Sequence, residues 1–290
     1  MSKAENCKLP TGTRILVRDR RFGRGMTQAR WWLRNDPYLT AIFNSLSVSF
    51  PKGEAFFVDS VRRLRSHAHP DRAADIAAFV QQEVIHSREH IAFNRRATDS
   101  GYDVKALEAS VDDRLAVACT KPPIVNLAAT MAFEHFTAIF AERLLADLRH
   151  MDLVDPEIAD LWRWHAVEEL EHKAVAFDLY LDATHNWHPF KRWLLRSYVM
   201  LRVTQQFITD RTRGALELLR QDGLYGPVTW VRLMHRILVK PGMLRQVVPA
   251  WARYFRPSFH PWQQDDRELI EKHDAEGPYR LRRAEPTVSC

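Results

Sequence analysis

The segment WRWHAVEELEHK at residues 162–173 contains the pattern that decides the fold. Its Glu169 and His172 are three residues apart, so a helix would place both side chains on one face. That face continues in both directions at helical spacing, mostly with apolar side chains: Ile158, Trp162, His165, Ala176 and Leu179. A carboxylate and two imidazoles thus interrupt the face of a helix that should point into a hydrophobic core.

A second segment, QEVIHSREHIAFN at residues 82–94, has the same Glu-x-x-His spacing at Glu83 and His86. With 13 histidines in the chain, two such pairs are close to what chance produces, so the spacing alone is weak. The surroundings carry more weight, because this pair also lies on the same predicted helix face as the apolar residues Ile76, Phe79 and Phe93. His90 lies on that face too.

Two further acids lie in the same kind of setting on other predicted helices. Glu54 is in line with Phe50, Phe57, Val58 and Val61, and Glu134 with Leu127, Met131, Ala138, Ala141 and Leu145. An ionised carboxylate on a core face is costly unless a cation compensates it. A solvent-facing or ion-paired residue is the ordinary alternative for any one of these acids, but the ordered set of four indicates a common cause.

These acids fall on four helical segments that the sequence predicts at residues 53–66, 70–94, 123–149 and 155–182. The first segment follows Pro51, a residue suited to an opening helical turn. A connection of about 20 residues, itself partly helical, separates the second segment from the third. Two helices, a long connection and two more helices is the order of a ferritin-like four-helix bundle, so we expect an all-α fold.

We expect a single ferritin-like domain over residues 30–265. Its core bundle at 53–182 would be covered by C-terminal helices within 187–255, one at 189–219 and one or two at 223–253. Residues 1–29 are expected to form an irregular basic arm with a short strand at 14–17, and residues 266–290 a polar tail.

The composition agrees with a soluble helical protein. Of 290 residues only 10 are glycine, which argues against a turn-rich sandwich or barrel. No clean apolar run is long enough to span a membrane and no signal peptide is visible, so we expect a cytoplasmic protein. The net charge of +6 comes with no nucleic-acid-binding signature, and we expect no nucleic-acid partner. Solvated termini explain the charge most simply, and an Arg-lined entrance for an anionic substrate is the alternative.

A dinuclear metal site would explain the buried acids. The three cysteines are far apart, which leaves histidine and carboxylate as metal ligands. Four carboxylates nearly neutralise two divalent ions, and this ligand set suits iron or manganese. The predicted ligands are Glu54, Glu83, His86, Glu134, Glu169 and His172.

Other side chains extend this prediction. His165 and His90 lie one turn from the two pairs and are either additional ligands or hydrogen-bonding partners. Gln82 and Glu168 are placed to hydrogen-bond the outer nitrogens of imidazoles on neighbouring helices, or are surface residues. Thr137, three residues after Glu134, donates a hydrogen bond either near the position where O2 would bind to the metals or to its own helix backbone. The candidate cavity lining, with core packing as its alternative, is Phe57, Phe79, Phe136 and Met131.

The motifs also resemble a known family. FPKGEAFF at 50–57, FEHFTA at 133–138, FHPW at 259–262 and the two quoted segments look like the ferritin-like proteins catalogued as predicted metal-dependent hydrolases, over roughly residues 30–265. The ligand pattern is similar to that of non-haem di-iron oxygenases. The spacing of His165, Glu169 and His172 resembles that of the arylamine N-oxygenases, in which the extra histidine is a seventh ligand.

The resemblance implies that the six predicted ligands and His165 bind metal, and it assigns no role to His90. It further implies a place in bacterial secondary metabolism such as antibiotic biosynthesis, including hydroxylation of diterpenoid acids carried as coenzyme A thioesters.

We therefore expect an O2-activating di-iron monooxygenase that hydroxylates a bulky hydrophobic substrate, with a coenzyme A-linked acid as one substrate class. Two Fe ions, or Mn in their place, would be the cofactor and O2 the co-substrate. Electrons would come from a reductase or ferredoxin, because no nicotinamide or flavin fingerprint is visible. A di-metal hydrolase and an iron-binding protein without monooxygenase activity are the alternatives. A homodimer is kept as an option for the assembly.

Overall fold

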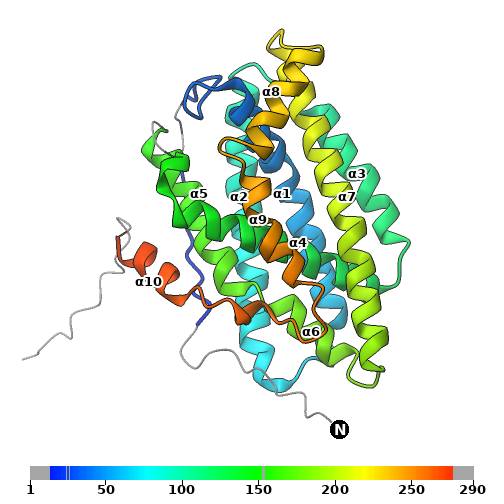
Figure 1. The fold of residues 1–290 in the computed structure, drawn as a ribbon. Coiled ribbons are helices and arrows are strands. Elements are labelled where there is room, and N and C mark those ends of the chain that lie inside the picture. The colour runs from blue at the N-terminus through cyan, green and yellow to red at the C-terminus, as the bar shows by residue number, and fades with distance from the viewer. Residues whose placement is uncertain (1–13, 24, 26, 152–153, 277–290) are drawn as a thin grey trace, which may run out of the picture.

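A computed structural model describes residues 14–23, 25, 27–151 and 154–276, and this part of the chain is helical without any strand (Figure 1). The central bundle consists of α1 (Pro37–Leu64), α2 (Ala73–Asp99), α4 (Pro123–Ala146) and the consecutive helices α5 (Pro156–His172) and α6 (Val175–Ala183). The connection between α2 and α4 contains α3 (Lys105–Cys119). The predicted all-α class, a bundle with a long second connection and added C-terminal helices, is confirmed.

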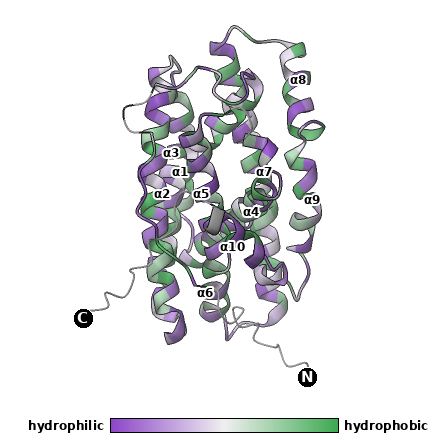
Figure 2. Ribbon diagram, turned by 90° about the vertical axis from the view of Figure 1, so that its left-hand side faces the viewer, coloured by the Kyte–Doolittle hydropathy of each residue, from purple (hydrophilic) through white to green (hydrophobic). Residues whose placement is uncertain are grey.

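The C-terminal helices cover one side of this bundle (Figures 1 and 2). The long helix α7 (Pro189–Gln221) lies along α1 and α4, and α8 (Pro227–Leu238) and α9 (Met243–Arg253) follow it across α1 and α4. Glycine allows α7 to approach α1 closely, because a Cβ at Gly214 would lie 2.4 Å from Ser45 Oγ. Short 3-10 turns occupy Arg65–His67, Pro70–Arg72, Leu148–Met151 and Pro261–Gln263.

The first helix begins earlier than predicted. Asp36 accepts hydrogen bonds from the backbone N–H groups of Tyr38 (2.9 Å) and Leu39 (3.1 Å), so α1 starts at Pro37 instead of near residue 53. Pro51 therefore lies inside the helix. A proline leaves the carbonyl four residues earlier without its usual N–H partner. Asn94 of α2 donates its side-chain amide to this carbonyl, that of Ser47, at 3.2 Å, which satisfies the freed acceptor.

The strand predicted at residues 14–17 is wrong. This segment has no regular secondary structure and binds instead to helices on both sides of it. The N–H of Leu16 donates to Glu171 of α5 at 3.1 Å, and its carbonyl accepts from Gln82 of α2 at 3.1 Å. Residues 1–13 of the predicted arm lie outside the described residues.

Two other boundaries also differ from prediction. The helix predicted at 155–182 is interrupted between α5 and α6, where Lys173 donates to Asp266 at 2.6 Å and to the carbonyl of Gln264 at 2.7 Å. The predicted polar tail begins with a helix, α10 (Arg267–Glu276), whose Ile270 is buried in the core. Residues 277–290 of the tail lie outside the described part.

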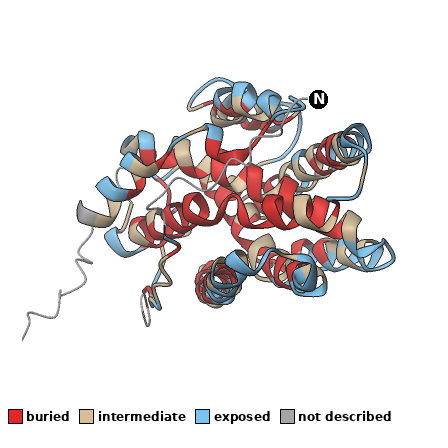
Figure 3. Cartoon of the chain, turned by 90° about the horizontal axis from the view of Figure 1, so that it is seen from below, coloured by how far each residue is buried: buried red, intermediate tan, exposed pale blue. Residues whose placement is uncertain are grey.

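The buried residues concentrate where the bundle helices face one another (Figure 3). Helix α4 lies at the centre, in contact with α1, α5, α6, α7 and α9. Within the described residues it is the one helix long and apolar enough to cross a membrane, and 67% of that stretch is buried inside the protein. This degree of burial is typical of a helix at the centre of a bundle.

Candidate metal centre

The seven predicted ligands meet in the interior of the bundle, although they come from four helices. Each has at most 4% of its surface exposed. Helix α1 contributes Glu54, α2 contributes Glu83 and His86, α4 contributes Glu134, and α5 contributes His165, Glu169 and His172. The helical spacing within α2 and α5 turns each Glu-x-x-His pair toward the same interior space.

The side chains form two adjoining groups. Ligand atoms of Glu54, His86 and His165 lie within 4.8 Å of one another, and so do those of Glu83, Glu169 and His172. Glu134 joins the second group, since its Oε2 is 3.2 Å from Nε2 of His172.

Two carboxylates lie between the groups. Oε1 of Glu169 is 2.7 Å from Nε2 of His165, and its Oε2 is 3.5 Å from Nε2 of His172. Oε1 of Glu83 is 3.2 Å from Nε2 of His172 and 3.9 Å from Nδ1 of His86. Glu83 and Glu169 could therefore be shared by two ions, as in carboxylate-bridged helical bundles.

Many inward-facing polar atoms of this cluster have no hydrogen-bond partner among the described residues. They are both carboxylate oxygens of Glu83 and Glu134, one oxygen each of Glu54 and Glu169, Nδ1 of His86 and Nε2 of His172. A buried acceptor without a partner is destabilising, so a set of eight such atoms facing one space indicates a missing positive ligand. Carboxylate oxygens and imidazole nitrogens without thiolates fit divalent iron or manganese.

The electrostatics of the cluster agree with this requirement. Burial raises the pKa of Glu54 and of Glu83 well above the usual range, and nearby carboxylates add to both shifts. Burial also raises the pKa of Glu134 to about 7, although His172 opposes the shift. Burial lowers the pKa of His86, and its neighbour His165 lowers it further. Acids that resist ionisation beside an unprotonated imidazole are stabilised when cations bind among them.

Each Glu-x-x-His imidazole is fixed from behind by a hydrogen bond. Nε2 of His86 lies 2.9 Å from Oε2 of Glu168, and Nδ1 of His172 lies 3.0 Å from Oε1 of Gln82. The hydrogen bonds predicted for Glu168 and Gln82 are thus present. When each ring is neutral and donates its outer N–H to these oxygens, its inner nitrogen has a free lone pair that can bind metal.

A further layer of side chains was not found from the sequence. Arg18 donates to Glu171 at 2.8 Å and approaches Glu168 at 3.3 Å, and Glu171 also accepts from Gln82 at 3.0 Å. On the other side, Ser87 donates to Oε2 of Glu54 at 2.9 Å. Arg18 lies 150 residues from Glu168 and has no helical spacing to it, so no local pattern could have revealed the contact.

His90 and Thr137 both point their polar atoms away from the cluster's interior. Nε2 of His90 lies 2.7 Å from Nδ1 of His165, and its Nδ1 lies 2.8 Å from Ser47 Oγ, so both nitrogens are engaged. His90 therefore orients His165, whose Nε2 faces Glu169. Thr137 Oγ1 donates to the backbone carbonyl of Glu134 at 3.1 Å, which is the alternative considered for it.

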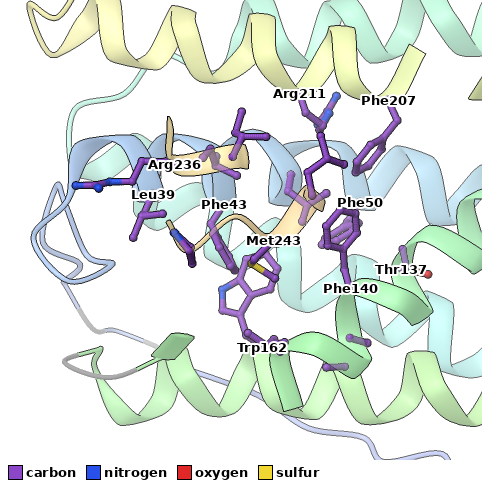
Figure 4. A pocket seen from close by; sticks show the side chains of 18 of the residues that line it. Leu39, Phe43, Phe50, Thr137, Phe140, Trp162, Phe207, Arg211, Arg236 and Met243 are labelled. Atoms are coloured by element: carbon purple, nitrogen blue, oxygen red, sulfur yellow. The ribbon is translucent and has the colours of Figure 1, made fainter. Parts of the chain in front are cut away.

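An apolar cavity of about 160 Å³ lies between the helices (Figure 4). It reaches the cluster, since Glu169 and His165 form part of its wall. Most of the remaining wall is hydrocarbon from α1, α4, α5, α7, the end of α8, the start of α9 and the segment between them, including Phe43, Phe50 and Trp162. The four predicted lining residues, Phe57, Phe79, Phe136 and Met131, do not line this cavity; they pack in a core cluster, which is the alternative considered for them.

Fold and cluster define an all-helical protein with a candidate dinuclear metal site. The chain belongs to the family of predicted metal-dependent hydrolases, whose family model matches residues 16–265. This description indicates a metal-dependent enzyme and names hydrolysis, and it gives no support to an oxidoreductase, to iron or to O2. No curated protein and no solved structure matches the chain. The ferritin-like, di-iron relationship therefore stays a prediction.

Proposed function

We propose that the seven clustered side chains hold two divalent metal ions. Glu54, His86 and His165 would bind one ion and Glu134 and His172 the other, with the two intervening carboxylates shared. The buried, partnerless oxygens and nitrogens of these residues support the proposal, because two cations would satisfy them together.

We further propose that the protein hydroxylates an apolar substrate with O2. The cavity carries this proposal, because its wall is mostly hydrocarbon and also contains two of the proposed ligands, His165 and Glu169. A redox-active metal pair would supply O2 reduction and oxidation of a substrate C–H bond, with two electrons from an external donor such as a ferredoxin and two protons from solvent, so that one oxygen atom enters the substrate and the other leaves as water. The cavity would present a hydrocarbon group to the cluster, as such chemistry requires.

The chain's own residues have distinct tasks in this proposal. The rings of Phe43, Phe50 and Trp162 exclude water and position the apolar group. Phe50 also packs against His165, with 4.9 Å between the ring centroids, and so connects the substrate wall to a ligand. Glu168 holds the outer proton of His86 at Nε2, which keeps that ring in the tautomer that can bind metal.

Hydrolysis is the second candidate, and the family description favours it. Two metals would then activate a water molecule and polarise an ester or phosphoester, and the cavity would hold its apolar part. Such a reaction profits from side-chain donors placed near the developing oxyanion. Thr137, a hydroxyl residue of the wall three residues after Glu134, is already bonded to the helix backbone.

The two candidates differ in their need for O2. The protein would first be analysed for metal, loaded anaerobically with Fe(II), and mixed with an apolar acid or its ester before and after O2 is added. Oxygenation predicts two metals per chain and a product that carries ¹⁸O from ¹⁸O2, whereas hydrolysis predicts turnover of the ester under argon. Iron oxidation without any product would indicate iron binding alone. Turnover by protein that holds no metal would refute both candidates.

A further inference from the structure

A partly buried cation without an acidic partner lines the apolar cavity. Two arginines contribute to the wall, Arg211 of α7 and Arg236 of α8 (Figure 4). Arg236 is neutralised within the protein, since it pairs with Asp36 at 2.8 Å. Arg211 forms no ion pair with any residue of the described chain. The adjacent acid, Asp210, is held by Arg114 at 3.0 Å.

The guanidinium of Arg211 is only partly satisfied. It donates one hydrogen bond, from Nη1 to the backbone carbonyl of Ser45 on α1. Burial lowers the pKa of Arg211 to about 10, so the side chain remains charged at neutral pH. A guanidinium has five N–H donors arranged to fit a carboxylate, and a charge facing hydrocarbon is stabilised strongly when an anion arrives. The cavity therefore has unused capacity for one negative group.

The position of Arg211 relative to the cluster follows from helix α1. Its contact Ser45 precedes Glu54 by nine residues on α1, which is about 13 Å along a helix axis. Between them, Phe50 lines the cavity and touches the ring of His165. A ligand bound to Arg211 at one end could therefore reach the cluster at the other end through continuous hydrocarbon surroundings.

We infer that the cavity binds an apolar carboxylic acid, with its carboxylate on Arg211 and its hydrocarbon body directed past Phe50 toward His165 and Glu169. This inference names the substrate class of the proposed function and rests on it. Arg211 is a binding residue in this arrangement and takes no part in the metal cluster.

Binding of two ligands that differ only in charge tests the inference. Full-length protein as purified would be titrated calorimetrically under argon with decanoate and with 1-decanol, so that no O2 is available to consume either ligand. We expect the protein to bind decanoate at least tenfold more tightly than decanol. Arg211→Gln should weaken decanoate binding by about 10- to 100-fold, the range for losing a charged hydrogen bond, and change decanol binding less than about twofold.

Two further variants complete the test. Arg213→Gln removes an exposed charge two residues along α7 and should leave both affinities unchanged. Arg211→Lys retains the charge and should retain a preference for decanoate, which keeps the test decisive if Arg211→Gln does not fold. Equal affinity of the unaltered protein for the two ligands, or an equal loss of both in Arg211→Gln, would overturn the inference.

The same experiment separates this inference from the proposed function. Binding is measured without turnover, so a protein that prefers the acid but shows no O2-dependent chemistry contradicts the proposed function alone. A protein that oxidises substrates but binds decanoate and decanol equally contradicts the role of Arg211 alone.

Discussion

Replacing Glu168 by Gln should weaken one of the two proposed metal positions selectively. Glu168 is fully buried, and its carboxylate accepts hydrogen bonds from His86 Nε2 at 2.9 Å, Trp164 Nε1 at 3.0 Å and Arg18 at 3.3 Å. All three partners donate, whereas a glutamine amide has only one oxygen. If that oxygen faces His86, the amide NH2 meets Trp164 and Arg18, which are donors themselves. If the amide is turned, His86 must carry its proton on Nδ1 and can no longer bind metal there.

The magnitude follows from this mismatch. A hydrogen bond to a charged group contributes about 1.5–3 kcal/mol and a neutral one about 0.5–1.5 kcal/mol. The loss of about 1–2 kcal/mol predicts roughly 5- to 30-fold weaker binding of the ion at His86, which overlaps the lower end of the effects of about 10- to 100-fold usual for residues behind a metal ligand. The ion at His172 should change little, because the partner of that ring is already an amide, that of Gln82.

The assay is a titration of metal-free protein with Mn(II), in which free Mn(II) is followed by electron paramagnetic resonance and bound metal is counted. Glu217→Gln serves as the control, since it removes a carboxylate of the same type that pairs with Arg220 on the surface at 2.8 Å. Two unchanged affinities in Glu168→Gln, or an equal loss at both positions, would refute the reasoning.

Three other outcomes can be checked directly. Glu134→Gln should reduce bound metal from two ions toward one per chain in metal analysis, because it removes a ligand 3.2 Å from His172, and retention of both ions would argue against the assignment. Gly214→Val should lower the free energy of unfolding in urea by about 2 kcal/mol, since the new Cβ would lie 2.4 Å from Ser45 Oγ; an unchanged midpoint would contradict the close helix contact. Burial raises the pKa of Tyr180 to about 12, so the contribution of its protonated phenol to stability should be complete below pH 10 and decline between about pH 10 and 12. Phenolate absorbance and circular dichroism, recorded together, would follow this decline, and Tyr180→Phe should reduce it.

The predictions from sequence that succeeded concern helical periodicity. Spacing of three or four residues is a local property, so the face shared by Glu169 and His172 follows once the segment is helical. The same reasoning placed Glu54 and Glu134 on inward faces, and all four acids are buried together. Whether they bind metal stays a prediction.

The predictions that failed depended on contacts between distant segments. Pro51 predicted a helix start, and the amide of Asn94, 43 positions further along the chain, allows the helix to continue through it. Phe57 and Phe79 are apolar residues near ligands, as cavity-lining residues often are, but the segments packed against each position decide whether its ring meets the cavity or the core. Arg18 had no local signal for its contact with Glu171.

The helical class, the order of the helices and the inward register of the acids and imidazoles can be predicted from the chain alone, because they follow from a period of 3.6 residues along one segment. Which groups meet depends on how the helices pack. That packing brought Glu168 and Gln82 behind two imidazoles, turned His90 toward His165 and left Arg211 unpaired in an apolar wall. Those relations depend on the packing angle and rotation of whole helices, which no local spacing specifies.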